Sequence, residues 1–470
     1  MKLRLGVKVR ALRRREGLTQ VRLAERLGIS ASYLNLIEHD KRPLTAPLLI
    51  KLASLFELDV TTFGSEQDSA LESDLLEVFG DPMFEGMGLT NVVVREVISS
   101  APEVGRAVLE LYRSYRNAEA QAARLALTVA DGQDMADTHA RLPSEEVTAF
   151  VQQHRNHLPA LEEGAMALWR DARLQPDDLC TGLARHLESL GIRVRFCPAK
   201  AGAIRRYDPG RRELSLSDGL ARSARRFQLA HQVALITLAD TLDELSSSDG
   251  LKSEASRALC RMVLANYFAG AVMMPYTGFH TACEAERYDI DLLARRYGAT
   301  FEQVCHRMTT LQRSGQEGVP FHFLKVDTAG NISKRFSASG IRFARFGGAC
   351  PRWNVSMSLL SPGRLRIQVS KMPGGAHYFC VARTVRRSAG GFRAPEIVHA
   401  IGLGCELSYA GRLVYADGMD LSSVEVVPIG VTCRLCDRPR CEQRAFPSLG
   451  AELHLDENVR GFGFYTRSWE

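Results

Sequence analysis

The pentapeptide His-Gln-Val-Ala-Leu at residues 231–235 constrains the middle of this chain more than any other feature. In the zinc-binding pattern His-Glu-x-x-His, two histidines one helical turn apart hold the metal, and the glutamate between them is the general base. Here Gln232 cannot accept a proton, and Leu235 offers no atom that binds zinc. We therefore expect a helix that keeps the form of such a site without its chemistry, and we predict no catalytic residue in it.

The length and composition are typical of a multidomain globular protein. At about 100–200 residues per domain, a chain of 470 residues has room for three or four domains. Apolar residues make up 45% of the chain and charged residues 24%, which excludes a disordered protein. No apolar run reaches about 18 residues, and the segment after Met1 lacks the apolar stretch of a signal peptide. We expect no membrane span and a cytoplasmic protein.

Basic residues concentrate in two regions of the chain. Residues 1–42 contain 11 Lys or Arg and 4 Asp or Glu, and residues 332–447 contain 17 and 7, while the whole chain has a net charge of only +6. The remaining residues are therefore acidic. Basic regions bind polyanions such as DNA or the phosphates of a nucleotide-like ligand, although a solvated Arg-rich surface gives the same pattern.

Residues 1–65 have the spacing of a helix-turn-helix domain. Thr19 is a good N-cap, Gly28 permits a tight turn, Ser30 caps the following helix, and Thr45 begins a further one. Apolar residues fall on the inner faces of the first two helices: Leu23, Ala24, Leu27, Leu34 and Ile37. Two helices joined by a short turn that contains glycine form a helix-turn-helix.

The stretch from Gly17 to His39 resembles the Cro and phage-repressor type of helix-turn-helix. This resemblance implies that the helix beginning near Ser30 enters the major groove of double-stranded DNA. Four residues of that helix would face bases or phosphates: Ser30, Ser32, Tyr33 and Asn35. Gln20 would contact the DNA backbone, and four basic residues would position the domain on phosphates: Arg13, Arg14, Lys41 and Arg42. A helical protein-interaction module is the alternative.

Residues 66–144 are expected to form a helical connector. Pro82 and the glycines at 86 and 88 interrupt it, and the polar residues 130–144 read as a linker. Residues 104–127 repeat apolar side chains every three or four positions, which predicts a long amphipathic helix. One DNA-binding domain buries too little surface for tight binding, so we expect a homodimer on a two-fold operator. The long helix either forms the interface of this dimer or packs only on the neighbouring helix of the same chain.

Residues 145–320 contain two segments that point to one domain. Residues 225–236 read Arg-Arg-Phe-Gln-Leu-Ala-His-Gln-Val-Ala-Leu-Ile, and residues 264–275 read Leu-Ala-Asn-Tyr-Phe-Ala-Gly-Ala-Val-Met-Met-Pro. Their order and spacing resemble the ImmA/IrrE metallopeptidase-like family, which implies an α+β domain. The acidic third zinc ligand of that family has no counterpart in residues 259–264. A catalytic zinc needs three protein ligands and only His231 survives, so we expect a hydrogen-bonded core histidine, no peptidase activity, and a pocket apolar enough for an acyl chain.

Residues 321–470 change to short strand patterns separated by glycine and proline. Four runs predict strands: 321–326, 365–369, 378–381 and 424–429. A mixed α+β or mostly β domain follows. The predicted fold class is therefore multidomain, with an all-α helix-turn-helix domain and connector followed by an α+β ImmA/IrrE-like domain and a mixed α+β C-terminal domain.

Three of the eleven cysteines form a compact cluster, Cys433, Cys436 and Cys441. Thiolates at this spacing can turn inward around one centre, and both an iron–sulfur cluster and structural zinc take four such ligands. Cys405 is the candidate fourth ligand and Cys350 its alternative, because each lies in a Gly-flanked turn. We favour an iron–sulfur cluster over zinc, and a metal-free set of thiols is the remaining interpretation.

Basic and aromatic residues also lie together in the C-terminal domain. A cation beside an aromatic ring suits adenine stacking and phosphate pairing in a ligand such as coenzyme A. The candidate ligand-binding residues are Lys325, Lys334, Arg335, Phe336, Arg352 and Trp353, with His231 in the preceding domain. No Gly-rich phosphate loop of the Walker or Rossmann type is present in the sequence.

The whole chain resembles the bacterial short-chain acyl-CoA transcriptional regulators, the PrpR-like and RamB-like group. Residues 329–337, 347–354 and 429–447 carry the C-terminal part of this resemblance. It implies control of propionate or acetate catabolism, CoA or a short-chain acyl-CoA as effector, and a C-terminal 4Fe–4S cluster. We expect the effector between the third and fourth domains. Two alternatives remain: an iron–sulfur redox sensor indifferent to acyl-CoA, and a metal-dependent peptidase that cleaves a repressor.

Overall fold

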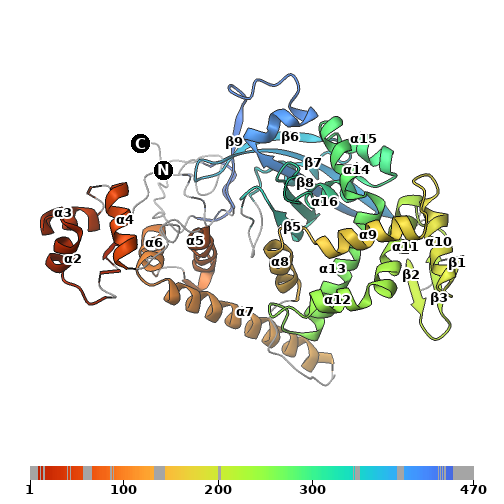
Figure 1. The fold of residues 1–470 in the computed structure, drawn as a ribbon, viewed down its shortest axis with the longest axis horizontal. Coiled ribbons are helices and arrows are strands. Elements are labelled where there is room, and N and C mark those ends of the chain that lie inside the picture. The colour runs from red at the N-terminus through yellow and green to blue at the C-terminus, as the bar shows by residue number, and fades with distance from the viewer. Residues whose placement is uncertain are drawn as a thin grey trace. The chain divides into compact units, whose positions relative to one another are not determined.

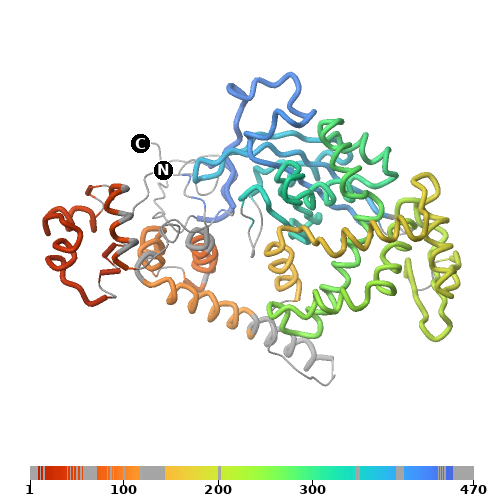
Figure 2. The backbone as a smooth tube through the Cα atoms, in the orientation of Figure 1, coloured from red at the N-terminus to blue at the C-terminus, as the bar shows by residue number. Residues whose placement is uncertain are grey.

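The computed structural model forms two compact units, Met1–Thr138 with Cys433–Glu470, and His139–Thr432, and each is described by itself. Their backbone is traced in Figure 2. The structure describes residues 9–10, 12–13, 16–39, 41–42, 44–56, 66–84, 87, 89–131, 143–198, 203–341, 343, 350–388, 396–431, 433, 436, 438 and 441–447.

Three helices of the first unit form the helix-turn-helix domain: α2 (Gln20–Leu27), α3 (Ala31–Glu38) and α4 (Ala46–Leu55). The Thr19 side chain accepts a hydrogen bond from the backbone of Arg22 at 3.3 Å, and Ser30 accepts one from Tyr33 at 3.1 Å. Gly28 ends α2 with φ 72°, a left-handed conformation that glycine adopts without strain. The buried core is Val9, Leu23, Ala24, Leu27, Leu34, Ile37, Leu48 and Leu52. The predicted caps, turn and core are confirmed.

The connector folds as helices α5 (Glu66–Phe79), α6 (Asn91–Ser100) and α7 (Pro102–Asp131), which pack on one another, with the short 3-10 helix η2 (Pro82–Phe84) between α5 and α6. Leu109 and Tyr112 of α7 are buried, and the Tyr112 hydroxyl donates to Asp81 at 2.6 Å. One face of the long helix therefore packs on its neighbours. Leu111, by contrast, is 71% exposed on the other side of α7.

The second unit begins with a helical layer and a small sheet (Figure 1). Its helices are α8 (Pro143–Gln153), α9 (Pro159–Asp171), α10 (Leu179–Ser189), α11 (Arg222–Thr237), α12 (Ala239–Ser246), α13 (Glu254–Met273), α14 (Tyr276–Ala285), α15 (Ile290–Tyr297) and α16 (Phe301–Met308). Strand β3 (Glu213–Ser217) lies between β1 (Arg193–Cys197), to which it is parallel, and β2 (Arg205–Asp208), to which it is antiparallel. The two diagnostic segments lie on α11 and α13, which pack against each other.

Among the described residues, no single helix has the length and apolar composition needed to cross a bilayer. The neighbouring helices α13 and α14 meet that test only when taken together, and they are bent by 64° with respect to each other.

A six-stranded sheet forms the second half of this unit, in the order β5-β4-β8-β7-β6-β9. Its strands are β4 (His322–Asp327), β5 (Ile332–Ser337), β6 (Arg366–Lys371), β7 (His377–Ser388), β8 (Glu396–Glu406) and β9 (Val426–Pro428). All neighbours are antiparallel except β6 and β9. The four predicted strands are confirmed, while β5 and β8 did not stand out in the sequence. Helix α17 (Asn354–Ser358) packs on one face of this sheet.

A single apolar core runs through the second unit, from Val147 on α8 to Ala416 after the sheet. It joins Phe301 and Val304 of α16 to Phe323 of β4, so it crosses the predicted domain boundary at residue 320. Side chains of the two predicted domains therefore pack against each other here, and the location of the effector between these domains stays a prediction. The mixed helical and strand content of this unit confirms the predicted fold class.

Candidate functional site

His231 lies in the middle of α11 and is 3% exposed. Its Nδ1 is in hydrogen-bond contact with the guanidinium of Arg205, which β2 brings to the helix. Burial, and secondly the charge of Arg205, lower the pKa of His231 to about 4. The imidazole is therefore neutral at pH 7 and accepts the hydrogen bond. The prediction of a hydrogen-bonded core histidine is confirmed.

The other positions of the zinc pattern offer no replacement ligand. Gln232 is 3% exposed, and Leu235 packs against the core. On α13, Arg261 lies in the stretch where an acidic ligand was sought, and it forms an ion pair with Asp243 of α12. Among the described residues, no group of three or more His, Cys, Asp or Glu side chains is arranged to hold a metal ion. The scaffold here presents cations and apolar side chains to its one surviving histidine.

The outward face of α3 carries small polar groups suited to DNA. Ser32 and Asn35 are exposed, and Lys41 and Arg42 are exposed just beyond the helix end. The Ser30 hydroxyl is used as the helix cap, and Tyr33 is half-buried. Of the described candidates, Ser32 and Asn35 are therefore best placed to contact bases, and Lys41 and Arg42 are best placed to contact phosphates. The predicted contact Arg14 lies outside the described residues.

The buried carboxylate of Glu38 binds side chains from three segments of the helix-turn-helix domain or lies close to them. Glu38 is 1% exposed and accepts hydrogen bonds from Arg13 Nε at 2.6 Å and from Gln20 Nε2 at 2.7 Å. Burial alone would raise the pKa of Glu38, but these bonds outweigh it and lower the pKa. Gln20 Nε2 also lies 3.3 Å from Asn35 Oδ1. Arg13 is therefore held within the domain by Glu38, and its contact with a DNA phosphate stays a prediction.

The C-terminal sheet separates the predicted ligand-binding residues instead of gathering them. Lys325 pairs with Lys334 across β4 and β5, whereas Leu324 pairs with Arg335. Because successive side chains on a strand point to opposite faces, the two lysines share one face and Arg335 lies on the other. Two further candidates divide in the same way, since Phe336 is buried in the main core with Phe323, while Trp353 is buried with Leu324. Arg352 is half-buried beside Trp353, and His231 lies in the helical layer.

Three cations surround one carboxylate on the first face, and we call Lys325, Lys334, Arg387 and Glu302 the basic cluster. Lys325 Nζ donates to Glu302 at 2.9 Å, and Arg387 donates to the other oxygen of the same carboxylate at 2.6 Å. Burial is the main cause that lowers the pKa of Lys334, to about 8, with Lys325 and Arg387 adding to it and Glu302 opposing it. The cluster has more positive than negative charge, so it suits an anion.

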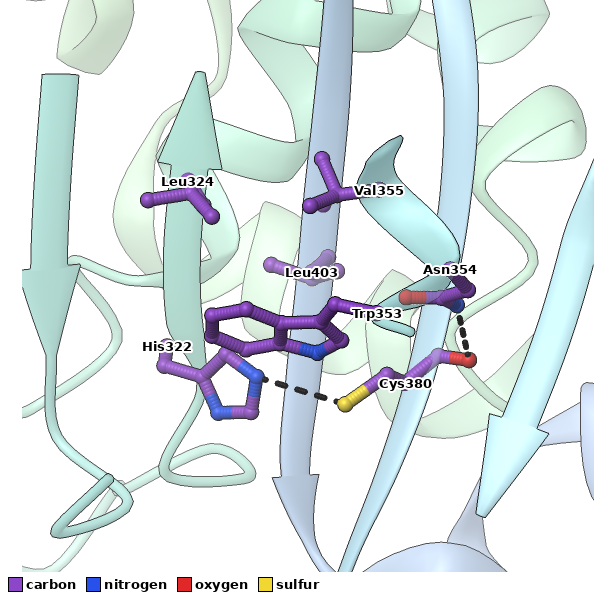
Figure 3. Close-up of a pocket in the computed structure, with 8 residues that line it drawn as sticks. His322, Leu324, Trp353, Asn354, Val355, Cys380 and Leu403 are labelled. Carbon is purple, nitrogen blue, oxygen red and sulfur yellow. Dashed lines mark hydrogen bonds between the residues drawn. The ribbon is translucent and has the colours of Figure 1, made fainter. Parts of the chain in front are cut away.

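A small pocket lies on the opposite face, between the sheet and α17 (Figure 3). His322 and Cys380 point toward each other across it, with the sulfur 3.5 Å from His322 Nε2, and Trp353 lies over them. Asn354 donates to the Cys380 carbonyl at 2.9 Å. Its remaining lining residues are Leu324, Val355, Gly402 and Leu403.

The chemistry of this pocket is that of neutral groups. Burial lowers the pKa of His322 to about 3 and raises the pKa of Cys380 to about 12. At neutral pH the imidazole is unprotonated and the thiol keeps its proton. A nucleophilic cysteine needs the thiolate, so this Cys–His pair is not poised for covalent catalysis.

The cysteine-rich segment of the first unit is organised by Arg444. Its guanidinium donates to the carbonyls of Cys433 and Cys436 at 2.8 Å each, and to that of Arg438 at 2.6 Å. The backbone N–H of Ala445 lies 3.4 Å from the Cys433 sulfur, a contact of the kind that stabilises a thiolate ligand. The donors thus fit an iron–sulfur cluster in chemistry, but the described sulfurs are not gathered around a common centre.

The two candidates for a fourth ligand differ in their surroundings. Cys405 is fully buried in the main core, and this burial raises the pKa of its thiol. Cys350 is 7% exposed at the edge of the smaller core, beside Trp353. Both candidates are thus buried among apolar side chains, and the choice of Cys405, with Cys350 as its alternative, stays a prediction.

Comparison with known proteins agrees with this arrangement along the chain. The family "Short-chain fatty acyl coenzyme A regulator, C-terminal" matches residues 310–465, "IrrE N-terminal-like domain" matches 187–309, and "Helix-turn-helix" matches 9–63. The HTH-type transcriptional regulator RamB of Mycobacterium tuberculosis (strain ATCC 25618 / H37Rv) is 40% identical over 463 residues, which cover 97% of this chain and 96% of RamB. This chain belongs to the short-chain fatty acyl coenzyme A regulator family. It is a helix-turn-helix transcriptional regulator, and the resemblance found in the sequence is confirmed.

Two further relatives and a solved structure support the assignment of this regulator. PrpR of the same Mycobacterium strain is 40% identical over 459 residues, covering 97% of this chain and 94% of PrpR. A propionyl-CoA carboxylase regulator of Cereibacter sphaeroides is 41% identical over 461 residues, covering 98% of each. A solved Mycobacterium tuberculosis transcriptional regulator superposes with a TM-score of 0.66 at 41% identity, covering 69% of this chain and 99% of that one. These curated relatives are named as regulators, not as enzymes.

The sequence did not reveal those residues that contact a site from a helix or strand far away in the chain. Arg205, which contacts His231, and Glu302, which anchors the basic cluster, gave no local signal. His322 and Cys380 are 58 positions apart and meet only because β4, β8 and β7 are adjacent. Arg444 lies among several arginines near the cysteines, and nothing in the local sequence distinguishes it from them.

Buried neutral histidines make the second unit of the regulator sensitive to mild acid. The pKa values of His231 and His322 lie at about 4 and about 3, below the value of about 6.5 in an unfolded chain. The unfolded chain therefore binds more protons below pH 6.5, so stability is full above that pH and is lost as the pH falls. We expect the free energy of unfolding to drop between pH 6.5 and 5 by up to about 1.4 kcal/mol per pH unit for each histidine.

Urea denaturation of the full chain, followed by fluorescence of the buried Trp353, measures this slope. In the His322→Gln variant, the free energy of unfolding should fall less steeply with pH, by the contribution of one histidine. A free energy of unfolding that stays constant from pH 6.5 to 5 would refute the neutral state of these histidines.

Proposed function

We propose that this regulator adjusts its binding to operator DNA in response to CoA or a short-chain acyl-CoA, and so controls propionate or acetate catabolism in the cytoplasm. The observation that carries the proposal is the peptidase-like scaffold without zinc ligands, in which Arg205 contacts His231, attached to a helix-turn-helix domain. A scaffold that keeps its packing and has lost its catalytic groups is suited to binding rather than to hydrolysis. The relatives include a propionyl-CoA carboxylase regulator, which supports the metabolic assignment.

The regulator would bind its operator as a homodimer. Val104, Leu111 and Tyr115 are 54%, 71% and 42% exposed on α7. Their spacing of seven and four residues places them on one face of the helix. Such an apolar face, away from the side that packs on α5, suits a second copy of the same helix.

DNA reading is tested by separating base contacts from phosphate contacts. We expect Asn35→Ala to cost about 1–3 kcal/mol on the preferred duplex and to relax sequence preference, because Asn35 is exposed on α3. Lys41→Ala should weaken all duplexes alike and reduce the slope of log affinity against log salt by about 1. Fluorescence anisotropy with a duplex selected from a random library by the full chain measures both.

Arg13→Ala is the contrasting variant, because its loss uncouples Glu38 and should lower the melting temperature of the domain. If the full chain selects no duplex, or if Asn35→Ala leaves the selected sequence unchanged, the assignment of α3 as the reading helix is wrong.

The phosphates of the effector are assigned to the basic cluster. Three cations and one carboxylate leave an excess of positive charge on this face of the sheet. Guanidinium and ammonium groups are the donors that phosphates prefer in proteins. The closed pocket on the opposite face has no such donor among its lining residues, although Arg335 and Arg386 lie on that face outside the pocket.

Calorimetric titration of the full chain with CoA, acetyl-CoA and propionyl-CoA tests the effector. Arg387→Gln should weaken binding about tenfold, or ~1.4 kcal/mol, because one phosphate donor is removed. Arg386→Gln is the matched control, since its side chain is 57% exposed, pairs with Glu396 and points to the other face of β7. Absence of saturation up to millimolar concentration, or equal loss in both variants, would contradict the assignment.

The cysteine-rich segment is proposed to hold the iron–sulfur cluster, with zinc as the alternative. Cys433, Cys436 and Cys441 would be ligands, and Arg444 would hold their backbone in place. When bound, such a cluster supplies one-electron redox chemistry, and the protein supplies the thiolates that hold it. We derive no step of DNA or effector binding from it.

Metal analysis of anaerobically purified protein tests this proposal. Iron and sulfide should be stoichiometric in the natural chain and absent in Cys436→Ala. Cys405→Ala should also lose iron if Cys405 is the fourth ligand, whereas loss of iron in Cys350→Ala alone would assign that role to the alternative. Zinc in place of iron would decide for the alternative, and loss of DNA binding only on exposure to air would favour a redox sensor over an acyl-CoA sensor.

A further inference from the structure

Lys334 occupies an unusual position in the basic cluster. It lies on β5, the edge strand of the six-stranded sheet, directly across from Lys325 of β4. Its side chain is half-buried. Among the described residues it has no hydrogen-bond acceptor, because the nearby carboxylate of Glu302 already accepts from Lys325 and Arg387. The Lys334 amine is thus left out of the local ion pairs, on an edge strand and in a residue that is only half-buried.

The charged groups around this amine come from three elements. Helix α16 contributes Glu302 and the neutral His306, β4 contributes Lys325, and β7 contributes Arg387. Helix α8 also packs on β5, and it contacts the strand through uncharged Gln152, which donates to the Ser337 carbonyl at 2.6 Å. Two cations against one carboxylate disfavour a third positive charge, so the environment favours the uncharged amine. With a pKa of about 8, about a tenth of Lys334 is unprotonated at pH 7, far more than for a lysine with the ordinary pKa of about 10.4.

We propose that Lys334 is a site of covalent acylation by a short activated acyl donor with an anionic leaving group, either an acyl phosphate or an acyl-CoA thioester. The amine lone pair attacks the acyl carbonyl carbon, and an amide C–N bond forms. The C–O bond to phosphate or the C–S bond to CoA breaks, and the leaving group takes the electron pair. The nitrogen releases its proton to solvent, and nothing is oxidised or reduced. The proposal shares with the proposed function only the short acyl donor.

The cluster explains why this lysine would react ahead of others. Lys325 and Arg387 attract an anionic donor and stabilise the negative charge that develops on the carbonyl oxygen. Lys325 itself donates to Glu302, so its amine is engaged in that ion pair. Acylation removes one of three crowded positive charges and leaves an amide at the edge of the sheet.

Mass spectrometry of the full chain after incubation with donors tests the proposal. The probes are propionyl phosphate, propionyl-CoA and the uncharged thioester propionyl N-acetylcysteamine. At pH 7.5 we expect Lys334 to react at least tenfold faster than Lys252, which is exposed in the loop before α13, and faster with both anionic donors than with the uncharged one. The rate at Lys334 should rise with pH and level off above about 8.

Two variants should change the rate in opposite directions. Glu302→Gln removes the one negative charge and should speed acylation below pH 8, whereas Arg387→Gln removes a positive charge and should slow it. Lys334→Arg should abolish the modification while circular dichroism shows a folded chain. Equal labelling of Lys334 and Lys252, or identical rates in the two charge variants, would overturn the proposal.

These outcomes separate the inference from the proposed function. Saturable propionyl-CoA binding without modification at Lys334 overturns the acylation site and leaves the acyl-CoA sensor standing. Selective modification by propionyl phosphate in a chain that shows no saturable CoA binding supports the site and refutes the sensor.

Discussion

The buried ion pair between Arg307 and Glu162 is the contact on which the large unit depends. Both side chains are 2% exposed, and Arg307 Nη2 donates to the carboxylate at 2.9 Å. Tyr267 donates to the same carboxylate at 2.6 Å, so α9, α13 and α16 meet at one pair of charges. Burial alone would raise the pKa of Glu162, yet these contacts lower it. Removing one partner of such a pair costs about 3–5 kcal/mol, because the other charge stays buried without compensation.

Helix α16 connects this pair to the sheet. Arg307 anchors its C-terminal end in the helical layer, while Glu302 in its first turn accepts hydrogen bonds from β4 and β7. An anion at the basic cluster would compete with Glu302 for Lys325 and Arg387, so its binding energy would act directly on this helix. A ligand shifts a conformational equilibrium only by its difference in affinity for two states, and this competition is where such a difference can arise.

Local signals in the sequence predicted the local structure well. The caps Thr19 and Ser30, the turn at Gly28 and four of the strands follow from residue types a few positions apart. Contacts between distant segments could not be predicted in this way. Arg13 pairs with Glu38, 25 positions away, and no local pattern indicates this contact. The candidate ligand residues formed one group in sequence and two in space, because alternation along β4 and β5 sends neighbours to opposite faces.

This alternation also limits what a bound acyl-CoA can do. A ligand whose phosphates rest on the basic cluster lies on the opposite face of the sheet from the His322 pocket. That pocket is closed by tight packing, since a Cβ at Gly404 would stand 2.5 Å from the His322 ring and 2.8 Å from the Phe379 carbonyl. An acyl chain could enter it only by displacing buried side chains, so the acyl group of the proposed effector would lie on the same face as the cations. The nearest amine there without an ion pair is Lys334, so the proposed phosphate site and the proposed acylation site would share one surface of the sheet.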